Sequence, residues 1–266
     1  MSKNKKKLMK NFDNKKIIID VILPNYNKFD FLEESINSVV NQTFKNWHLY
    51  IIDDCSTDNS WLIIKKFSNQ DNISLIKLRK NMGASFCRNY AMRISESRYL
   101  SFIDSDDTWK NTKLEKQINF MEKNNLQFTY TDYLPFFEKS EKKIYKKETS
   151  IRDTFDFNAF INNSSINTST MIIKRSILGN LRFKKIKLME DYLFKCRLLK
   201  RNYIAKKLNE NLATYRILNE SRSSKRLKNI FSLWSINKKY NKLSFLKNCM
   251  SVICISINSI KKYGIK

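Results

Sequence analysis

The stretch Phe102-Ile103-Asp104-Ser105-Asp106-Asp107 places three carboxylates directly behind the apolar run Tyr99–Ile103. That run is short, aromatic and β-branched, which is typical of a buried strand. Acids that follow such a strand lie at the carboxyl edge of the sheet, where ligands bind in open α/β folds. Crowded carboxylates repel one another, and Mg²⁺ or Mn²⁺ shared with substrate phosphates would relieve the repulsion. The stretch therefore predicts a metal–diphosphate site. Alternatively, Asp106, Asp107 or Thr108 could be the N-cap of a helix through Leu114.

Two earlier apolar runs also lead into segments that could bind a ligand at the edge of the sheet. His48–Ile52 leads into Asp53-Asp54-Cys55-Ser56-Thr57-Asp58, and Ile17–Leu23 leads into Pro24-Asn25-Tyr26-Asn27. A carboxylate at a sheet edge can accept a hydrogen bond from a ribose hydroxyl or a base N–H, and an aromatic ring suits a planar base. These strand ends predict a nucleotide site.

A glycine and an arginine follow in the next connection. The chain has only three glycines, so Gly83 indicates a backbone turn before the helix expected at Ala84–Ile94. Arg88 lies about one turn into that helix, within reach of a phosphate. A solvated surface arginine is the alternative.

Strand-like and helical patterns alternate through the first half of the chain, which predicts an α/β fold with a mostly parallel sheet between helices. The polar stretch Glu138–Ser150 indicates a loop or hairpin, Ser169–Ile173 a later strand, and Asp191–Leu199 a helix.

In their order, these motifs resemble those of family 2 glycosyltransferases. The matching residues are Val21–Asn27, Ile51–Asp58, Asn81–Gly83 with Arg88-Asn89, Phe102–Asp107, Met189–Tyr192, and Tyr215-Arg216 with Ser221 and Ser223. The resemblance covers roughly residues 16–225. It implies a GT-A fold, with a Rossmann-like nucleotide-binding half and an acceptor-binding half.

The resemblance also assigns roles on the donor side. Asp104 would contact the ribose, and Asp106, in the DXD motif, would bind Mg²⁺ or Mn²⁺ across the diphosphate. The other expected nucleotide-sugar contacts are Pro24 and Tyr26 at the base, Asp54 at the base or ribose, Arg88 at the nucleotide, and Arg216 over the phosphates.

On the acceptor side, the resemblance makes Asp191 the general base that takes the proton of the attacking hydroxyl. Glu190 would orient the acceptor or replace Asp191 in that role, and the two neighbours cannot be separated from the sequence.

The chain departs from the family pattern at three places. The family usually has Thr or Ser where Asn25 stands and Gly where Cys55 stands, so the local backbone shape there is in question. The family often has Pro after Trp109, where this chain has Lys110-Asn111. Neither the Gln-x-x-Arg-Trp motif of processive synthases nor their spanning helices are present, which predicts transfer of a single sugar.

The net charge is +26 over 266 residues, which invites a nucleic-acid or membrane interpretation. The basic residues are mostly Lys, and Asn and Ile are also abundant, so compositional bias explains much of the charge. The five scattered cysteines contain no Cys-x-x-Cys pair, which favours free thiols in a reducing compartment over zinc or disulfides. The one histidine, His48, is expected to be a strand-end side chain.

The two ends of the chain differ from its middle. Residues 1–15 are rich in Lys and Asn and are expected to be a disordered basic N-terminus. Residues 226–266 are expected to form an amphipathic helical tail, with apolar residues at helical spacing and lysines around them. The uncharged run Cys249–Ile260 is too short to span a bilayer. It either lies in an anionic membrane interface or packs on the catalytic domain.

Together these features predict a cytoplasmic glycosyltransferase, peripheral on the inner face of the plasma membrane if the tail binds lipid. Its partners would be a nucleotide-diphosphate sugar, most commonly a UDP-sugar in this family, and a saccharide or lipid-linked acceptor of surface polysaccharide synthesis, with inversion. A sugar nucleotidyltransferase would require a Gly-rich basic loop after the first strand, and that loop has no glycine. A nucleic-acid-binding protein is the other alternative, but acids near three strand ends would repel a phosphate backbone.

Overall fold

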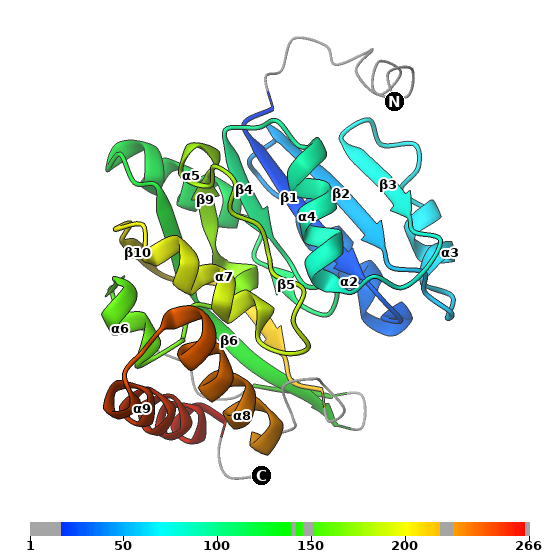
Figure 1. The fold of residues 1–266 in the computed structure, drawn as a ribbon. Coiled ribbons are helices and arrows are strands. Elements are labelled where there is room, and N and C mark those ends of the chain that lie inside the picture. Colours follow the sequence, from blue (N-terminus) through cyan, green and yellow to red (C-terminus); the bar gives the residue numbers. More distant parts are fainter. Residues whose placement is uncertain (1–16, 140–141, 146–151, 219–225, 264–266) are drawn as a thin grey trace.

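The fold is built around one mixed sheet, seen in the computed structural model, which describes residues 17–139, 142–145, 152–218 and 226–263. The strand order is β3-β2-β1-β4-β9-β6-β10-β5, with β7 paired to β6 and β8 paired to β10 (Figure 1). The strands are β1 Ile19–Asn25, β2 Trp47–Asp53, β3 Ile73–Lys77, β4 Tyr99–Phe102, β5 Thr108–Trp109, β6 Phe128–Lys139, β7 Lys142–Tyr145, β8 Thr154–Phe155, β9 Ile172–Lys174 and β10 Ala205–Arg216.

The first half is a parallel β-α-β unit. Strands β3, β2, β1 and β4 pair in parallel, and helices α2 (Phe29–Val40), α3 (Ser60–Lys65) and α4 (Ala84–Ile94) connect them. Since β1 pairs with both β2 and β4, the strand order reverses beside β1. Such a switch point opens a crevice at the carboxyl ends of the strands.

The second half extends the sheet with short antiparallel strands between long ones. Strand β9 runs antiparallel to both β4 and β6, whereas the long strands β6 and β10 are parallel to each other. The remaining helical elements of this half are α5 (Lys113–Lys123), α6 (Phe157–Ile161), η1 (Thr168–Thr170), η2 (Arg175–Ile177) and α7 (Glu190–Leu199).

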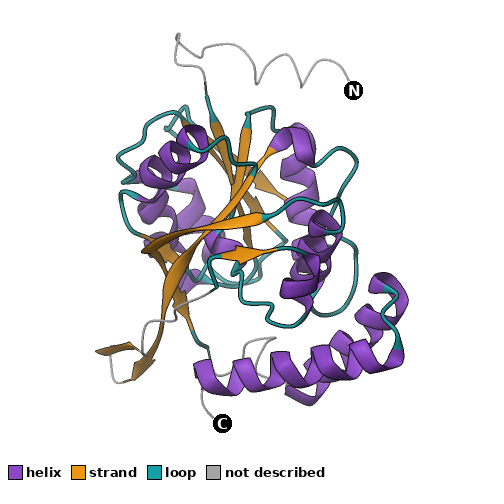
Figure 2. Ribbon diagram, turned by 90° about the vertical axis from the view of Figure 1, so that its left-hand side faces the viewer, coloured by secondary structure: helices purple, strands orange, loops and turns teal. Residues whose placement is uncertain are grey.

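Helices cover both faces of the sheet (Figure 2). Helices α4 and α7 lie on one face, and α2, α3 and α5 lie on the other (Figure 1). Buried aliphatic and aromatic side chains from the strands and from these helices form one continuous core. The expected α/β fold with a mostly parallel sheet is confirmed.

Several local expectations are corrected. Asp106, Asp107 and Thr108 do not cap a helix, because Thr108 begins strand β5 and the next helix starts at Lys113. The segment Ser169–Ile173 is not one strand. Its first part is the 3₁₀ turn η1, in which the Asn167 side chain accepts from the Ser169 amide, and pairing begins only at Ile172.

Two other expectations are confirmed. The predicted hairpin after Glu138 is β6–β7 as far as the structure describes it, and the helix expected at Asp191 begins one residue earlier, at Glu190.

The C-terminal tail is helical. It consists of α8 (Arg226–Ile236), the π-helical turn η4 (Asn237–Asn241) and α9 (Phe245–Tyr263), at the lower end of the molecule in Figures 1 and 2. Among the residues that the structure describes, no helix is both long and apolar enough to cross a bilayer. The expected disordered segment 1–15 lies outside the described residues.

Candidate active site

The carboxyl ends of β1, β2 and β4 meet at one edge of the sheet. In the parallel register Asn25 lies opposite Asp53, and the Asn25 amide donates to Asp53 Oδ1 at 2.9 Å and to Ser56 Oγ at 3.1 Å. The Ser56 amide and hydroxyl also donate to the Asp53 carboxylate. Asn25 thus ties the end of β1 to the loop after β2.

The neighbouring acid, Asp54, holds the loop before α4. Its two carboxylate oxygens accept from the amides of Met82 and Gly83 at 2.7 and 2.8 Å, and the side chain is buried. Gly83 has φ +87°, a left-handed value that favours glycine, which confirms the expected turn. Asp54 is therefore a structural link between two loops at this edge.

The two residues expected at the nucleobase differ in exposure. Pro24 is buried within β1, whereas Tyr26, just beyond the strand end, is 44% exposed. Of these two residues, Tyr26 is the one whose ring is accessible and can stack on a base.

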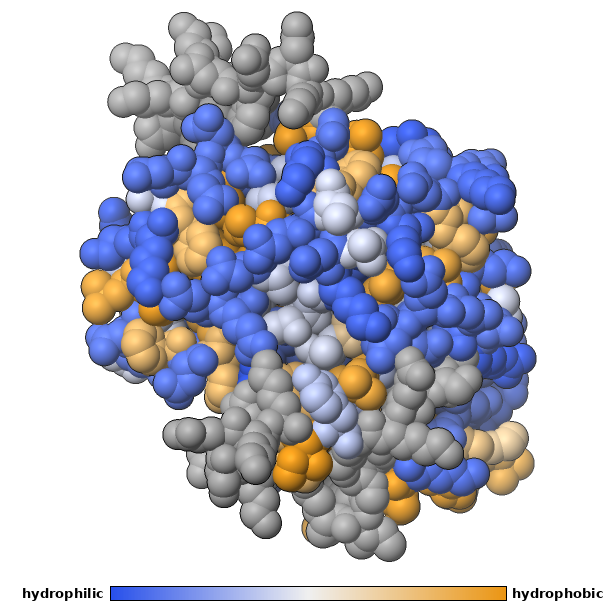
Figure 3. Space-filling view, turned by 180° about the vertical axis from the view of Figure 1, so that it is seen from behind, coloured by the Kyte–Doolittle hydropathy of each residue, from blue (hydrophilic) through white to orange (hydrophobic). Residues whose placement is uncertain are grey.

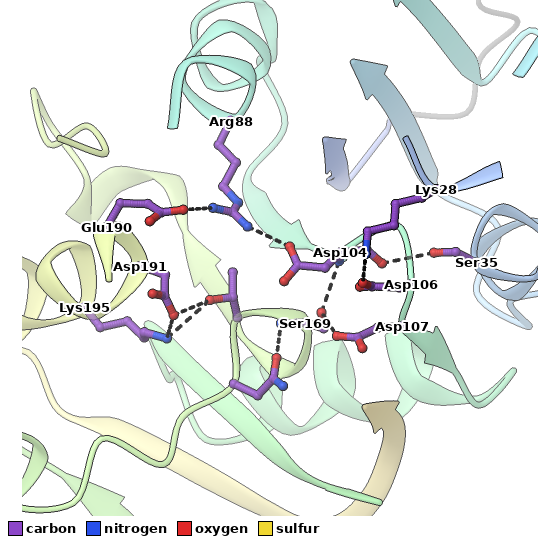
Figure 4. A network of polar contacts seen from close by, with 12 residues as sticks. Lys28, Ser35, Arg88, Asp104, Asp106, Asp107, Ser169, Glu190, Asp191 and Lys195 are labelled. Carbon is purple, nitrogen blue, oxygen red and sulfur yellow. Dashed lines mark hydrogen bonds and ion pairs between the residues drawn. The ribbon is translucent and has the colours of Figure 1, made fainter. Parts of the chain in front are cut away.

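Arg88 connects the donor-side acids with the start of α7 (Figure 4). Its Nη2 atom donates to Asp104 Oδ1 at 2.6 Å, and its Nη1 atom lies 3.6 Å from Glu190 Oε1. Burial disfavours the charged form of Arg88, but the carboxylates of Asp104, Glu190 and Asp191 outweigh it and raise its pKa. The guanidinium is thus a fixed positive charge between three acids.

The acids after Asp104 have separate partners. Asp106 Oδ2 lies 2.8 Å from the Lys28 ammonium, and Asp107 is fully buried, where it accepts from Ser169 Oγ at 2.6 Å and from the Arg216 amide at 3.2 Å. Burial raises the pKa of Asp106 despite the opposing attraction of Lys28. Burial together with its acidic neighbours raises the pKa of Asp107 well above its usual range.

Asp104 and Asp106 are the candidate metal ligands at this edge, with 37% and 20% of their side chains exposed. Within the described ranges, no three His, Cys, Asp or Glu side chains converge closely enough to hold a metal ion by themselves. Mg²⁺ is commonly held by one or two carboxylates together with substrate phosphates, so this donor set fits such an ion when a diphosphate is present.

Asp191 lies at the start of α7, across Arg88 from Asp104 (Figure 4). Lys195, one turn further on, donates to its Oδ2 atom at 2.8 Å, and Thr168 Oγ1 donates to the same atom at 3.2 Å. Burial raises the pKa of Asp191, but the charge and hydrogen bond of Lys195 outweigh it and hold the pKa below its usual value. Asp191 is 39% exposed and ionised at neutral pH, whereas the Glu190 side chain is 9% exposed.

Arg216, at the end of β10, is built into the floor of the site. Its Nη2 atom lies 2.5 Å from Glu34 Oε2, and its Nε atom donates to the Asp106 carbonyl at 3.1 Å. The guanidinium lies between the rings of Phe31 and Phe136, with centroids 4.5 and 4.6 Å away. The side chain is 1% exposed, so Arg216 is a buried support that contacts the acid cluster through the Asp106 carbonyl and the Asp107 carboxylate.

Sequence reasoning missed several residues of the site. Lys195 had a signal, since it stands four residues after Asp191 in a predicted helix. Ser169 had none. Its hydroxyl accepts from the Asp104 amide and donates to Asp107, across more than sixty residues of sequence. Lys28 carried only the general signal of a basic residue in a loop at a strand end.

A family comparison agrees with this geometry. The sequence model of the glycosyl transferase family 2 matches residues 20–182, which include the strand ends at Asp53 and Asp104. The chain belongs to glycosyltransferase family 2. It is therefore a glycosyltransferase, as the motif order predicted.

This family 2 glycosyltransferase has relatives over nearly its whole length. It is 33% identical over 253 residues to the putative teichuronic acid biosynthesis glycosyltransferase TuaG of Bacillus subtilis (strain 168), covering 94% of this chain and 98% of TuaG. It is 32% identical over 220 residues to WfgD of Escherichia coli, a UDP-Glc:alpha-D-GlcNAc-diphosphoundecaprenol beta-1,3-glucosyltransferase, covering 82% and 85%.

Solved structures share its fold. TarS of S. aureus in complex with UDP-GlcNAc has a TM-score of 0.69 at 19% identity, covering 92% of this chain and 73% of that one. In another TarS structure the same fold is 43% of a longer chain. The mannosyltransferase PcManGT from Pyrobaculum calidifontis, in complex with GDP-Man and Mn²⁺, has a TM-score of 0.66 at 13% identity, covering 98% and 76%. At these identities the likeness concerns the fold, and it confirms the GT-A expectation.

Proposed function

We propose that this glycosyltransferase moves one sugar from a UDP-sugar to a hydroxyl of a saccharide or lipid-linked acceptor, with inversion, in the synthesis of a cell-surface polysaccharide. The observation that carries the proposal is the bridge made by Arg88. It lies 2.6 Å from Asp104 at the end of β4 and 3.6 Å from Glu190 at the start of α7. A single cation thus brings the donor-side acids and the catalytic-base candidate Asp191 to the same sheet edge.

The donor would lie along the carboxyl ends of β1, β2 and β4. Tyr26 would stack on the base above Pro24, and Asp54 would accept from the base or ribose with a lone pair that its loop contacts leave. Asp104 would bind on the ribose side, next to Arg88. Arg216 would act from beneath the diphosphate through the Asp106 carbonyl that it holds.

Asp106, with Asp104, would hold Mg²⁺ or Mn²⁺ against the diphosphate. Such an ion, when bound, neutralises the charge that grows on the leaving diphosphate. Lys28, 2.8 Å from Asp106, would have to release the carboxylate or share it. Its position beside the leaving group would add a second positive charge there.

Asp191 would take the proton of the acceptor hydroxyl as that oxygen attacks the anomeric carbon from the face opposite the leaving diphosphate. One displacement of this kind inverts the configuration at that carbon. Lys195 keeps Asp191 ionised and fixes its orientation. Glu190, paired with Arg88 and largely buried, is better placed to orient the site than to exchange protons with an acceptor.

The names of two relatives support the proposed acceptor class. WfgD is named for a sugar on diphosphoundecaprenol, and TuaG for teichuronic acid. An acceptor of that kind consists of a saccharide on a lipid diphosphate, and a cytoplasmic enzyme would meet it at the inner face of the plasma membrane.

A screen of nucleotide sugars with and without Mn²⁺ tests the donor. UDP and one UDP-sugar should raise the melting temperature with metal, and that UDP-sugar should be consumed when a saccharide-diphosphate-lipid acceptor is added. Asp106→Asn should remove the metal-dependent part of the shift, whereas Asp71→Asn, at an exposed position in the turn before β3, should not. Equal stabilisation by UDP in EDTA would exclude the metal role. Binding of a different nucleotide alone would exclude the UDP donor.

A further inference from the structure

Helix α9 packs on the protein by a side that carries Val252 and Ile255 together with three hydrogen-bonding polar residues. Asn248 donates to the Trp234 carbonyl at 3.1 Å, Ser251 donates to the Ile161 carbonyl, and Asn258 donates to the Asn162 carbonyl at 3.3 Å. On a helix of 3.6 residues per turn these three positions share one side. That side therefore faces α8 and the end of α6, which together hold α9 in place.

The opposite side of α9 is an exposed apolar row. Leu246 is 79% exposed, and the row continues at spacings of three and four with Met250, Ile253, Ile257 and Ile260, which are 42–57% exposed. A surface helix normally buries its apolar side chains. Helix α9 packs Val252 and Ile255 against the core and still leaves this second apolar row exposed. Figure 3 shows apolar side chains at the lower right, toward this end of the molecule.

Helix α8 extends the apolar surface. Leu227 and Phe231 are each 73% exposed, and Phe245 at the start of α9 is 71% exposed. The Trp234 ring contacts the Phe245 ring edge-on, with centroids 5.6 Å apart, and so joins the two helices. A patch of this kind on a soluble domain marks an interaction site.

The charges of the chain segment that carries this patch are of one sign. Residues 226–266 contain no acidic residue. The basic residues of this segment are Arg226, Lys228, Lys238, Lys239, Lys242, Lys247, Lys261, Lys262 and Lys266. A second copy of the chain would bring the same positive charge against itself, whereas an anionic bilayer offers both a complementary surface charge and an apolar interior.

We infer that the exposed apolar row of α9, with Leu227 and Phe231 of α8, is a docking surface for an anionic lipid bilayer. The helices lie in the interface, with the apolar row among the acyl chains and the lysines at the head groups. No described helix is apolar and long enough for a spanning position.

The docking surface is fixed relative to the site. Tyr192 of α7 donates to Asn237 Oδ1 of η4 at 2.9 Å, and the Asn237 amide donates to Ser251 of α9 at 2.9 Å. The residue before Tyr192 is the base candidate Asp191. A bilayer under α9 therefore holds the site at a set distance from the membrane, which suits a lipid-linked acceptor if the proposed function holds.

Vesicle sedimentation of the full chain tests the surface. Wild type should bind vesicles of phosphatidylglycerol and phosphatidylcholine and should bind pure phosphatidylcholine far more weakly. Leu246→Ser with Ile253→Ser should lower the partition coefficient by at least about tenfold. The matched control is Leu62→Ser with Ile204→Ser, which changes one Leu and one Ile that are 54% and 53% exposed elsewhere, and it should bind as wild type.

A charge variant keeps the test valid if the apolar variant does not fold. Lys247→Gln with Lys261→Gln should weaken binding by about fivefold for each lysine removed, and added salt should weaken the wild type likewise. Equal binding of all variants would overturn the inference. The inference would also be overturned if the wild type were a dimer that does not bind vesicles, and if Leu246→Ser with Ile253→Ser converted that dimer into a monomer. Transfer to a soluble acceptor is measured in parallel. Absence of transfer by the wild type would contradict the proposed function and would leave the membrane inference to the vesicle measurements.

Discussion

The ammonium group of Lys28 lies 2.8 Å from Oδ2 of Asp106, so a cation of the chain itself already neutralises the carboxylate expected to bind metal. The pair joins the loop after β1 to the acids after β4. Since 27% of the Lys28 side chain and 20% of the Asp106 side chain are exposed, solvent and ligands can reach both. Lys28 and a metal ion therefore compete for the same carboxylate.

Removing Lys28 should strengthen metal binding in the absence of nucleotide. In Lys28→Met the carboxylates of Asp106 and Asp104 lose a nearby positive charge, so Mn²⁺ should bind about tenfold more tightly. Electron paramagnetic resonance of free Mn²⁺ measures the change. Lys66→Met, which removes an exposed lysine paired with Glu33, should leave Mn²⁺ affinity unchanged. Unaltered affinity in Lys28→Met would show that Asp106 does not bind the ion.

Asp191→Asn should slow sugar transfer without weakening the donor. The change keeps the size of the side chain and removes only the proton acceptor, and loss of general-base help typically costs about 10²–10⁴-fold in rate. UDP-sugar affinity on the same variant should stay close to that of wild type. Wild-type turnover would refute the assignment, and an equal loss in Glu190→Gln with normal folding would move the base to Glu190.

The pH profile should report the contact between Lys195 and Asp191. Because that contact holds the pKa of Asp191 below its usual value, the base stays ionised as the pH falls, and its acid limb should lie below about pH 4 in wild type. Lys195→Met removes the charge, so the pKa of Asp191 and the acid limb of kcat/KM should both move to higher pH. Lys116→Met, which breaks an exposed pair with Glu210, should leave the limb in place. If the acid limb of kcat/KM does not move in Lys195→Met, Asp191 is not the group that accepts the proton.

Replacing Arg216 should destabilise the fold as well as the site. Arg216→Met removes the ion pair with Glu34 and the cation that lies against the rings of Phe31 and Phe136, which should lower the free energy of unfolding by about 2–3 kcal/mol. Arg216→Lys should not restore it, because one ammonium cannot replace a planar group that bonds in two directions. Urea unfolding measures both. Arg98→Met, at an exposed pair with Glu122, should change stability by less than about 1 kcal/mol.

His48 should make the fold sensitive to mild acid. It is 6% exposed, with Nε2 2.9 Å from Ser74 Oγ, and burial lowers its pKa from 6.5 to about 4. Between these values the unfolded chain binds a proton that the folded chain does not, so stability falls as the pH drops from 6.5 to 4, by up to about 3 kcal/mol in total. Since His48 is the chain's one histidine, the difference between wild type and His48→Gln isolates this effect. A difference that is the same at pH 7 and pH 4.5 would contradict it.

The donor half of the fold was predictable because its signals are local. Each apolar run that ended in Asp or Asn became a strand ending at the same edge, and Gly83 marked the turn before α4. The unusual Cys55, where the family has glycine, lies at φ +62°, a left-handed value that explains why glycine is common there. The departure from the family pattern marked this position as one where the local backbone shape was in question.

The packing around the acids was not predictable, because it joins residues far apart in sequence. Thr108 lies in strand β5 and not at the start of a helix, because it pairs with Thr214 of β10. These two residues are more than a hundred positions apart in the sequence. The turn at Ser169 formed because the Asn167 side chain bonds the local backbone, which overrides the strand preference of the following residues. Periodicity carries no information on such partners.

The stacking of Arg216 between Phe31 and Phe136 has a consequence for chimeric enzymes. Glu34 and Arg216 are separated by 182 residues, yet they form one ion pair beneath the acids. A hybrid that takes its donor half from one relative and its acceptor half from another would split this pair across the junction. Attempts to change sugar preference by exchanging halves should therefore move Phe31 and Glu34 together with the last strand, or the recombined proteins will lose solubility before specificity can be measured.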